Sequence, residues 1–166
     1  TTARQLIDQG VARLDRGELK AQPGAEGKLR LTLADSYIAL GEYPKADAEL
    51  ARARFLLPPS SVDDLAQVHL RQGALRLAAE DLDGLQRKLD ESDAWLRVHA
   101  SSLAEPVTFA AQLQMSRANL LAHRERYDEA TSLARRAWQR MRKALGDDDK
   151  CTRAVLVEYA DILGSS

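Results

Sequence analysis

Apolar side chains recur along the chain at intervals of three and four residues, with charged and polar positions between them. The first such segment, residues 3–20, has Leu6, Ile7, Val11, Leu14 and Leu19. This spacing is typical of an amphipathic helix. The same period predicts further helices over 28–40, 44–57, 62–79, 82–100, 107–123, 128–144 and 150–163. No segment alternates with a period of two for long enough to predict a strand, so the pattern predicts an all-α protein.

Turn-forming residues separate these segments. AQPGAEG (21–27) predicts a turn between the first two helices, and Gly41 and Pro44 mark the next boundary. Ser60 and Ser61 are N-cap candidates, SSLAEP (101–106) predicts a loop or a broken helical turn, and GDDD (146–149) predicts a turn with an acidic N-cap. The connections are short, which favours antiparallel helix hairpins.

Two stretches of the sequence repeat one another. LADSYIALGEYPKADAELARAR (33–54) aligns with SRANLLAHRERYDEATSLARRAW (116–138), so that Ala34 matches Ala118 and Tyr43 matches Tyr127. Both pairs are 84 residues apart. A degenerate middle copy over 75–89 places Leu82 in the Tyr43 role, at an offset of 39, and a further step of 42 reaches Ala160.

Each repeated position has a physical role. The small residues let two helices of a hairpin approach closely, and the two tyrosines are expected to fill the gap beside the turn. A single hairpin cannot bury its apolar face, so repeated hairpins are expected to stack into a solenoid.

The repeat resembles the tetratricopeptide repeat. Ala34, Gly41, Tyr43, Ala46 and Pro58 match its small-and-aromatic pattern, whereas Glu125 stands where the second copy should have its turn glycine. The long connection near 144–154 is similar to the kinesin-light-chain variety. The resemblance implies a right-handed superhelix over 28–166, with repeats at about 28–59, 62–100 (degenerate) and 107–144 and a half repeat at 150–163. Residues 1–27 would form a helix and turn that pack on it.

The order of segments in the first third of the chain also resembles a region found in some larger bacterial proteins. TARQLIDQGVARLD, a Pro-Gly turn and LRLTLADSYIALGEYPKA resemble the region that follows the catalytic domain in some bacterial Ser/Thr kinases. Similar repeats follow the DNA-binding domain of some bacterial regulators. With Thr1 in place of a start methionine, this resemblance implies a piece of a larger bacterial signalling or regulatory protein.

Composition and charge narrow the function classes. The chain has 166 residues with 24 basic and 25 acidic side chains and a formal net charge of -1. Such a balance gives no long-range attraction to nucleic acid or to an anionic membrane, so neither is expected as a direct partner. The sequence shows no membrane-spanning or signal segment. A cytoplasmic location is therefore favoured, while an extracytoplasmic one would require a membrane span before Thr1.

No residue constellation indicates catalysis. His69, His99 and His123 are too far apart to form a helical metal pair, and no phosphate-binding loop or nucleophile motif is present. Cys151 follows three aspartates, which would raise its thiol pKa, so an inert residue is favoured over a nucleophile. We therefore expect no enzyme activity, no metal and no cofactor.

The resemblance places a binding groove on the first helices of the hairpins. An asparagine there could hold a peptide backbone with a donor and an acceptor. The groove positions carried over from the family are Lys28, Leu31, Asp35, Ile38, Gln67, Leu70, Arg71, Gln112, Met115, Asn119 and His123.

The expected function is a protein-interaction scaffold that binds a peptide or protein in this groove. The alternative is a sensor that binds a small peptide and changes the curvature of the solenoid. The half repeat also leaves a helix on which a second copy could stack to form a homodimer.

Overall fold

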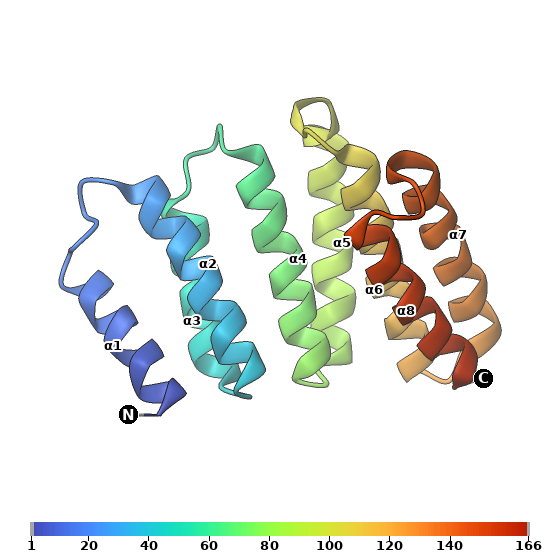
Figure 1. Ribbon diagram of the computed structural model, residues 1–166, viewed down its shortest axis with the longest axis horizontal. Coiled ribbons are helices and arrows are strands. Elements are labelled where there is room, and N and C mark those ends of the chain that lie inside the picture. The colour runs from blue at the N-terminus through green and yellow to red at the C-terminus, as the bar shows by residue number, and fades with distance from the viewer. Residues whose placement is uncertain (1, 166) are drawn as a thin grey trace. The chain divides into compact units, whose positions relative to one another are not determined.

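The computed structural model describes residues 2–165, which form α-helices joined by short connections (Figure 1). The helices are α1 (Ala3–Asp15), α2 (Pro23–Ala39), α3 (Tyr43–Leu56), α4 (Val62–Ala78), α5 (Leu82–His99), α6 (Pro106–His123), α7 (Tyr127–Leu145) and α8 (Lys150–Gly164), with a 3-10 turn at Ala100–Ser102. Over these residues no strand is formed, so the predicted all-α class is confirmed.

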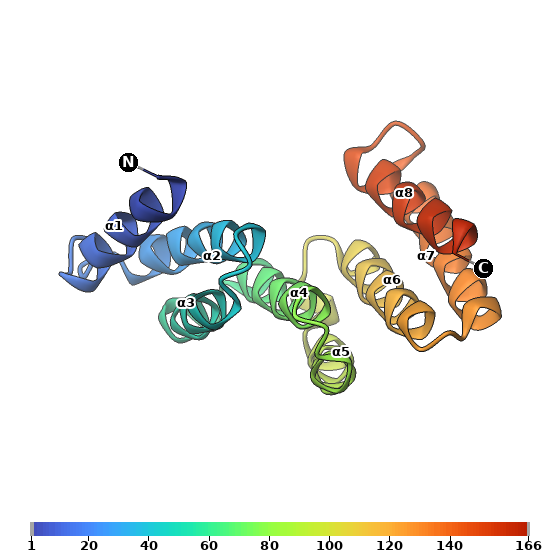
Figure 2. The same ribbon diagram turned by 90° about the horizontal axis from the view of Figure 1, so that it is seen from below.

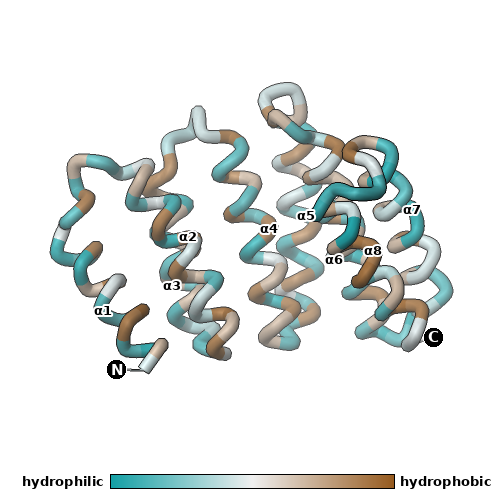
Figure 3. The backbone as a smooth tube through the Cα atoms, viewed as in Figure 1, coloured by the Kyte–Doolittle hydropathy of each residue, from teal (hydrophilic) through white to brown (hydrophobic). Residues whose placement is uncertain are grey.

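The chain divides into two compact units, Thr1–Glu80 and Asp81–Ser166. We call them the N-terminal unit and the C-terminal unit. Each has its own core, built on α2, α3 and α4 in the first and on α6, α7 and α8 in the second. Brown apolar and teal polar positions alternate along these helices (Figure 3), as expected for helices that bury one face.

Alanines allow the close approach of helices in both units. Ala34 of α2 and Ala46 and Ala53 of α3 are 0% exposed, and α2 lies beside α3 (Figure 2). Ala118 of α6 and Ala130 of α7 are equally buried at the matching positions of the C-terminal unit. The repeat alignment therefore identifies positions of the same packing role in the two units.

Three sequence-based expectations are corrected by the structure. Ala160 was matched to Ala34 and Ala118 but is exposed, because no described helix covers that side of α8. The turn expected over 21–27 is helical from Pro23 onward, since proline is well suited to the first position of a helix. Tyr43 and Tyr127 are only half-buried; they flank the turns without filling an enclosed gap.

The turns after α2, α4 and α6 share one unusual backbone conformation. Gly41, Glu80 and Glu125 all have left-handed φ angles, of 72°, 56° and 60°. These residues are 39 and 84 positions apart, the same offsets as in the sequence alignment. The structure thus supports that alignment, including the degenerate copy, and shows that two glutamates adopt a conformation that favours glycine.

Glu125→Gly should stabilise the protein, because glycine adopts a left-handed φ without a Cβ clash. We expect a gain of about 0.5–1 kcal/mol in unfolding free energy, measured by urea denaturation, after the entropic cost of glycine is deducted. The matched change Gly41→Ala should have the opposite sign and cost about 1 kcal/mol. Destabilisation by Glu125→Gly would contradict this account of the turn.

Gly27 lies where α2 approaches the end of α3 most closely. A Cβ added there would sit 2.9 Å from Leu57 Cγ and 3.4 Å from the Ala53 carbonyl oxygen. Leu57 is itself buried, at 4% exposure, so it has little room to move. The absence of a side chain at residue 27 therefore sets the spacing of the two helices.

Gly27→Ala should lower the unfolding free energy by about 1–3 kcal/mol, because overpacking outweighs the better helix propensity of alanine. Gly10→Ala in α1 is the control, since its added Cβ would be an ordinary 3.6 Å from Leu33 Cδ2. Thermal denaturation should show a lower Tm for the first variant and an unchanged or higher Tm for the second. Equal effects would show that residue 27 does not limit helix spacing.

A buried arginine joins three helices of the N-terminal unit. Arg30 of α2 is 3% exposed and donates from Nη1 to Glu49 Oε2 of α3 at 2.6 Å, from Nη2 to Asp15 Oδ1 of α1 at 2.9 Å, and to Glu26 Oε1. Burial alone would lower the pKa of Arg30, but these hydrogen bonds to Glu49, Asp15 and Glu26 raise it above its usual value. Arg30 therefore remains charged and holds α1 and α3 against α2.

A second contact of α1 is made through Asp8. Its Oδ1 accepts hydrogen bonds from Lys45 Nζ and from the Tyr37 hydroxyl, both at 2.7 Å. Tyr37 is 2% exposed. The hydrogen bond from Lys45, followed by that from Tyr37, lowers the pKa of Asp8. The contact consequently stabilises the fold above the ordinary carboxyl pKa and is lost as the pH falls through the lowered value.

Tyr37→Phe should raise the pKa of Asp8 toward its ordinary value while leaving it below that value, because the hydrogen bond from Lys45 remains. The measurement is an NMR titration of the side-chain carboxyl carbon of Asp8 in both proteins. Asp90 of α5, whose pKa is lowered by Gln86 and Arg117, provides an internal control whose titration should not change. An unchanged Asp8 curve would mean that the Tyr37 hydroxyl does not bond to it in solution.

Candidate functional site

The expected groove residues of the N-terminal unit lie on α2 and α4. Asp35 and Gln67 are exposed, while Ile38 and Arg71 are half-buried. Leu70, the other α4 residue expected there, is also half-buried. Helices α2 and α4 contact each other, so side chains more than thirty residues apart in sequence meet on one surface.

Arg71 is the centre of this surface. Its Nε donates to Asp35 Oδ1 and Oδ2 at 2.9 and 3.0 Å, and its Nη1 donates to Gln67 Oε1 at 2.9 Å. Asp35 comes from α2, whereas Gln67 comes from the preceding turn of α4 itself. Three of the residues expected from the sequence thus form one hydrogen-bonded group.

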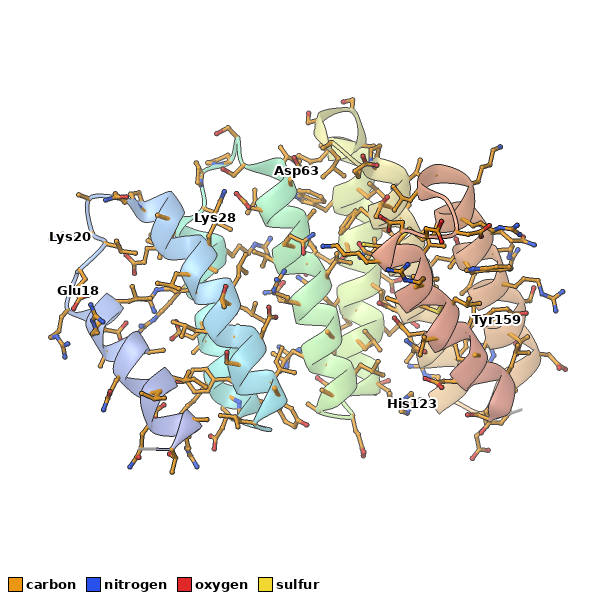
Figure 4. All side chains as sticks on the ribbon, in the orientation of Figure 1. Glu18, Lys20, Lys28, Asp63, His123 and Tyr159 are labelled. Carbon is orange, nitrogen blue, oxygen red and sulfur yellow. The ribbon has the colours of Figure 1, made fainter. Side chains whose placement is uncertain are left out.

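Lys28 extends the same surface toward the start of the two helices. It projects from α2 (Figure 4), and its Nζ lies 3.2 Å from Asp64 Oδ2 of α4. We call Lys28, Asp35, Ile38, Gln67 and Arg71 the α2–α4 surface. Asp64 was not among the expected residues, although its place in the first turn of α4 could have suggested it.

The C-terminal unit carries a second polar surface on α6 and α8. Asn119 Nδ2 donates to Glu158 Oε2 at 2.7 Å, and within the described residues the Asn119 side-chain oxygen accepts no hydrogen bond. Gln112 is half-buried on the same helix, and His123 is exposed at its end (Figure 4). We call Gln112, Asn119, His123 and Glu158 the α6–α8 surface. Sequence reasoning missed Glu158, because helical spacing alone does not show which residue lies opposite Asn119.

Two of the expected groove residues belong to the core. Leu31 is 5% exposed and shares a core cluster with Val68 of α4, and Met115 is 2% exposed and shares one with Val155 of α8. The expectation that these side chains face a partner is therefore wrong. Helix α4 packs on Leu31 and helix α8 packs on Met115, which the apolar pattern of a single helix could not show.

The charged segments of the C-terminal unit are partly paired with one another. Arg124 Nη2 lies 3.2 Å from Asp83 Oδ1, and Arg117 Nη2 lies 3.1 Å from Asp90 Oδ1. A hydrogen bond from the Gln86 side chain, together with Arg117, lowers the pKa of Asp90. These contacts join α5 to α6 and its C-cap Arg124, and they pair part of the charge on this surface.

The start of α8 is capped by an acidic side chain, and metal-binding and membrane-spanning features follow from the described residues as a whole. The backbone N–H of Cys151 donates to the Asp149 carboxylate at 2.7 Å, which makes Asp149 the N-cap of α8. Among residues 2–165 no group of three or more His, Cys, Asp or Glu side chains is placed to hold a metal ion. None of the described helices combines the length and apolar character needed to cross a bilayer.

Comparison of the chain with models of protein families, with curated proteins and with solved structures gives no match.

Proposed function

We propose that the chain is a protein-interaction module whose helices form antiparallel hairpins of the tetratricopeptide type, stacked as a solenoid, and that it binds an extended peptide on the α2–α4 surface. The shared left-handed turns at Gly41, Glu80 and Glu125 and the matched buried alanines support the repeat. The fold assignment and the binding function are separate parts of this proposal.

The observation that carries the binding function is the Arg71 group. A carboxylate, an amide and a guanidinium from two helices meet at the surface, so donors and acceptors stand side by side. A peptide backbone presents the same alternation of N–H and C=O groups, and a peptide carboxylate fits the fork of an arginine. Ile38 supplies an adjacent apolar contact.

The ion pairs of this surface can be replaced by contacts with a bound peptide at little cost in folding free energy. The Arg71 and Asp35 side chains are 26% and 48% exposed, and those of Lys28 and Asp64 are 63% and 26% exposed. Exposed pairs of this kind contribute about 0–1 kcal/mol. A bound peptide can therefore replace them without loss of the fold, in contrast to the buried Arg30 group.

The division of the chain into two compact units favours a sensor as a second candidate function. Each unit has a separate core and its own polar surface, so a bound peptide can change the packing of one unit while the other keeps its own core. Small-angle X-ray scattering separates the two candidates, because a sensor changes its radius of gyration when the peptide binds and a passive scaffold does not.

Arg71→Ala should weaken peptide binding by at least about tenfold while the unfolding free energy falls by less than about 1 kcal/mol. The probe is a set of peptides selected from a random library on the wild-type chain, with affinities measured by fluorescence anisotropy. Asn119→Ala tests the α6–α8 surface in the same way, since its exposed bond to Glu158 contributes little to stability.

Arg97→Ala is the matched control, because it removes an exposed arginine from α5, away from both surfaces. Peptides that bind all four proteins equally would place the binding site elsewhere and contradict the proposal. Failure to select any saturable peptide from the library would contradict it as well.

A further inference from the structure

The N-terminal unit has an open pocket on the side of α2 opposite the α2–α4 surface. Arg30 lines this pocket and is two positions after Lys28. Two residues correspond to about 200° around a helix, so Arg30 and Lys28 lie on opposite sides of α2. The pocket has a volume of about 790 Å³, within the range of small-molecule sites. It lies between the end of α1, the connection that follows, the start of α2 and the end of α3.

One wall of the pocket is apolar. Leu14 of α1 and Leu56 and Phe55 of α3 line it. Phe55 is 89% exposed, the highest value among the exposed large hydrophobic side chains of the described residues. An aromatic ring left in water at the rim of a pocket gains free energy when an apolar group covers it.

The floor of the pocket is charged. It is formed by Arg30, Glu26 and Asp15, and the Arg30 guanidinium donates to both carboxylates and to Glu49, which does not line the pocket. Arg52 of α3 also bonds to Asp15. Because these charges satisfy one another, the floor shapes the pocket and is not its binding group.

The binding charge lies on the connection between α1 and α2. Arg16 and Lys20, on the connection between α1 and α2 (Figure 4 labels Lys20), both line the pocket, and neither side chain forms an ion pair with any described residue. The hydrogen bond from Arg13 lowers the pKa of Glu18, with a smaller contribution from Arg16, and the Glu18 carboxylate is paired with Arg13 at 2.9 Å. Two cations are therefore available to an anion in the pocket.

The balance of charge favours an anion. Four basic residues line the pocket, Arg16, Lys20, Arg30 and Arg52, against two carboxylates, Asp15 and Glu26. The positive excess attracts a negatively charged group. The apolar wall requires an apolar group on the same molecule.

We propose that this pocket binds a carboxylate carried on an apolar group, with the carboxylate between Arg16 and Lys20 and the apolar group against Phe55 and Leu56. Two sources have this chemistry, a free aliphatic acid and the C-terminal residue of an apolar peptide. The site is separate from the α2–α4 surface, and its occupation does not depend on the peptide-binding function proposed above.

The test is a titration of the ¹⁵N-labelled full chain followed by amide chemical shifts. The first probe is octanoate, compared with octanamide, which has the same tail without the charge. The second is acetyl-Gly-Ser-Ala-Leu with a free C-terminus, compared with its C-terminal amide. A charged probe should give saturable shifts at residues 14–20 and 51–56 with a Kd below about 1 mM.

The double variant Arg16→Gln, Lys20→Gln should weaken binding at least about fivefold, since two partly exposed charge contacts are lost. The double variant Arg87→Gln, Arg97→Gln is the matched control, because it removes two exposed arginines from α5 and should leave the Kd unchanged. Phe55→Ser changes a side chain that is already exposed to water, so it should preserve the fold. It should also weaken the binding of whichever charged probe binds the wild-type chain.

Binding of either charged probe with this variant pattern supports the proposal, and the probe that binds identifies the source. The proposal is overturned if neither probe gives saturable shifts up to about 10 mM. It is also overturned if octanamide and the amidated peptide bind as well as the acids, or if the Arg16, Lys20 variant binds like the control.

Discussion

The close approach of neighbouring helices at alanine and glycine positions is the constraint on which both units depend. Ala34, Ala46 and Ala53 in one unit and Ala118 and Ala130 in the other leave no exposed surface. Side chains of this size bring helix backbones together, and the larger apolar residues then close the core around them. At Gly27 the helices are too close even for an alanine, because Leu57 occupies the space that a Cβ would need.

Charged groups serve two different purposes in the N-terminal unit. Arg30, Glu26 and Glu49 are buried and paired with one another, so removal of Arg30 would leave two carboxylates in the core without compensation. Arg71 and Asp35 have the same chemistry at the surface, where water competes for every hydrogen bond. Buried ion pairs thus hold the helices together, whereas exposed ion pairs of the same residue types can be replaced by contacts with a partner.

The sequence was sufficient to predict most helices and the repeat, but not the burial of individual groove residues. Apolar spacing placed α4 to α8 within a residue or two, and the offsets of 39 and 84 reappear in the backbone as left-handed turns at Glu80 and Glu125. The start of α2 was missed because Pro and Gly are turn signals in isolation. Leu31 and Met115 were misplaced because the apolar pattern along one helix does not include the helix packed beside it.

The sequence by itself determined the helical character of the chain, its internal sequence repeat and most of its turns, because these follow from contacts within a few residues and from a period visible in the sequence. Only the tertiary structure decided that Asp35 and Gln67 meet Arg71, that Glu158 meets Asn119, and that a pocket opens beside Arg30. The physical reason is that these features need side chains from different helices, and their meeting depends on how far apart and at what rotation the helices pack.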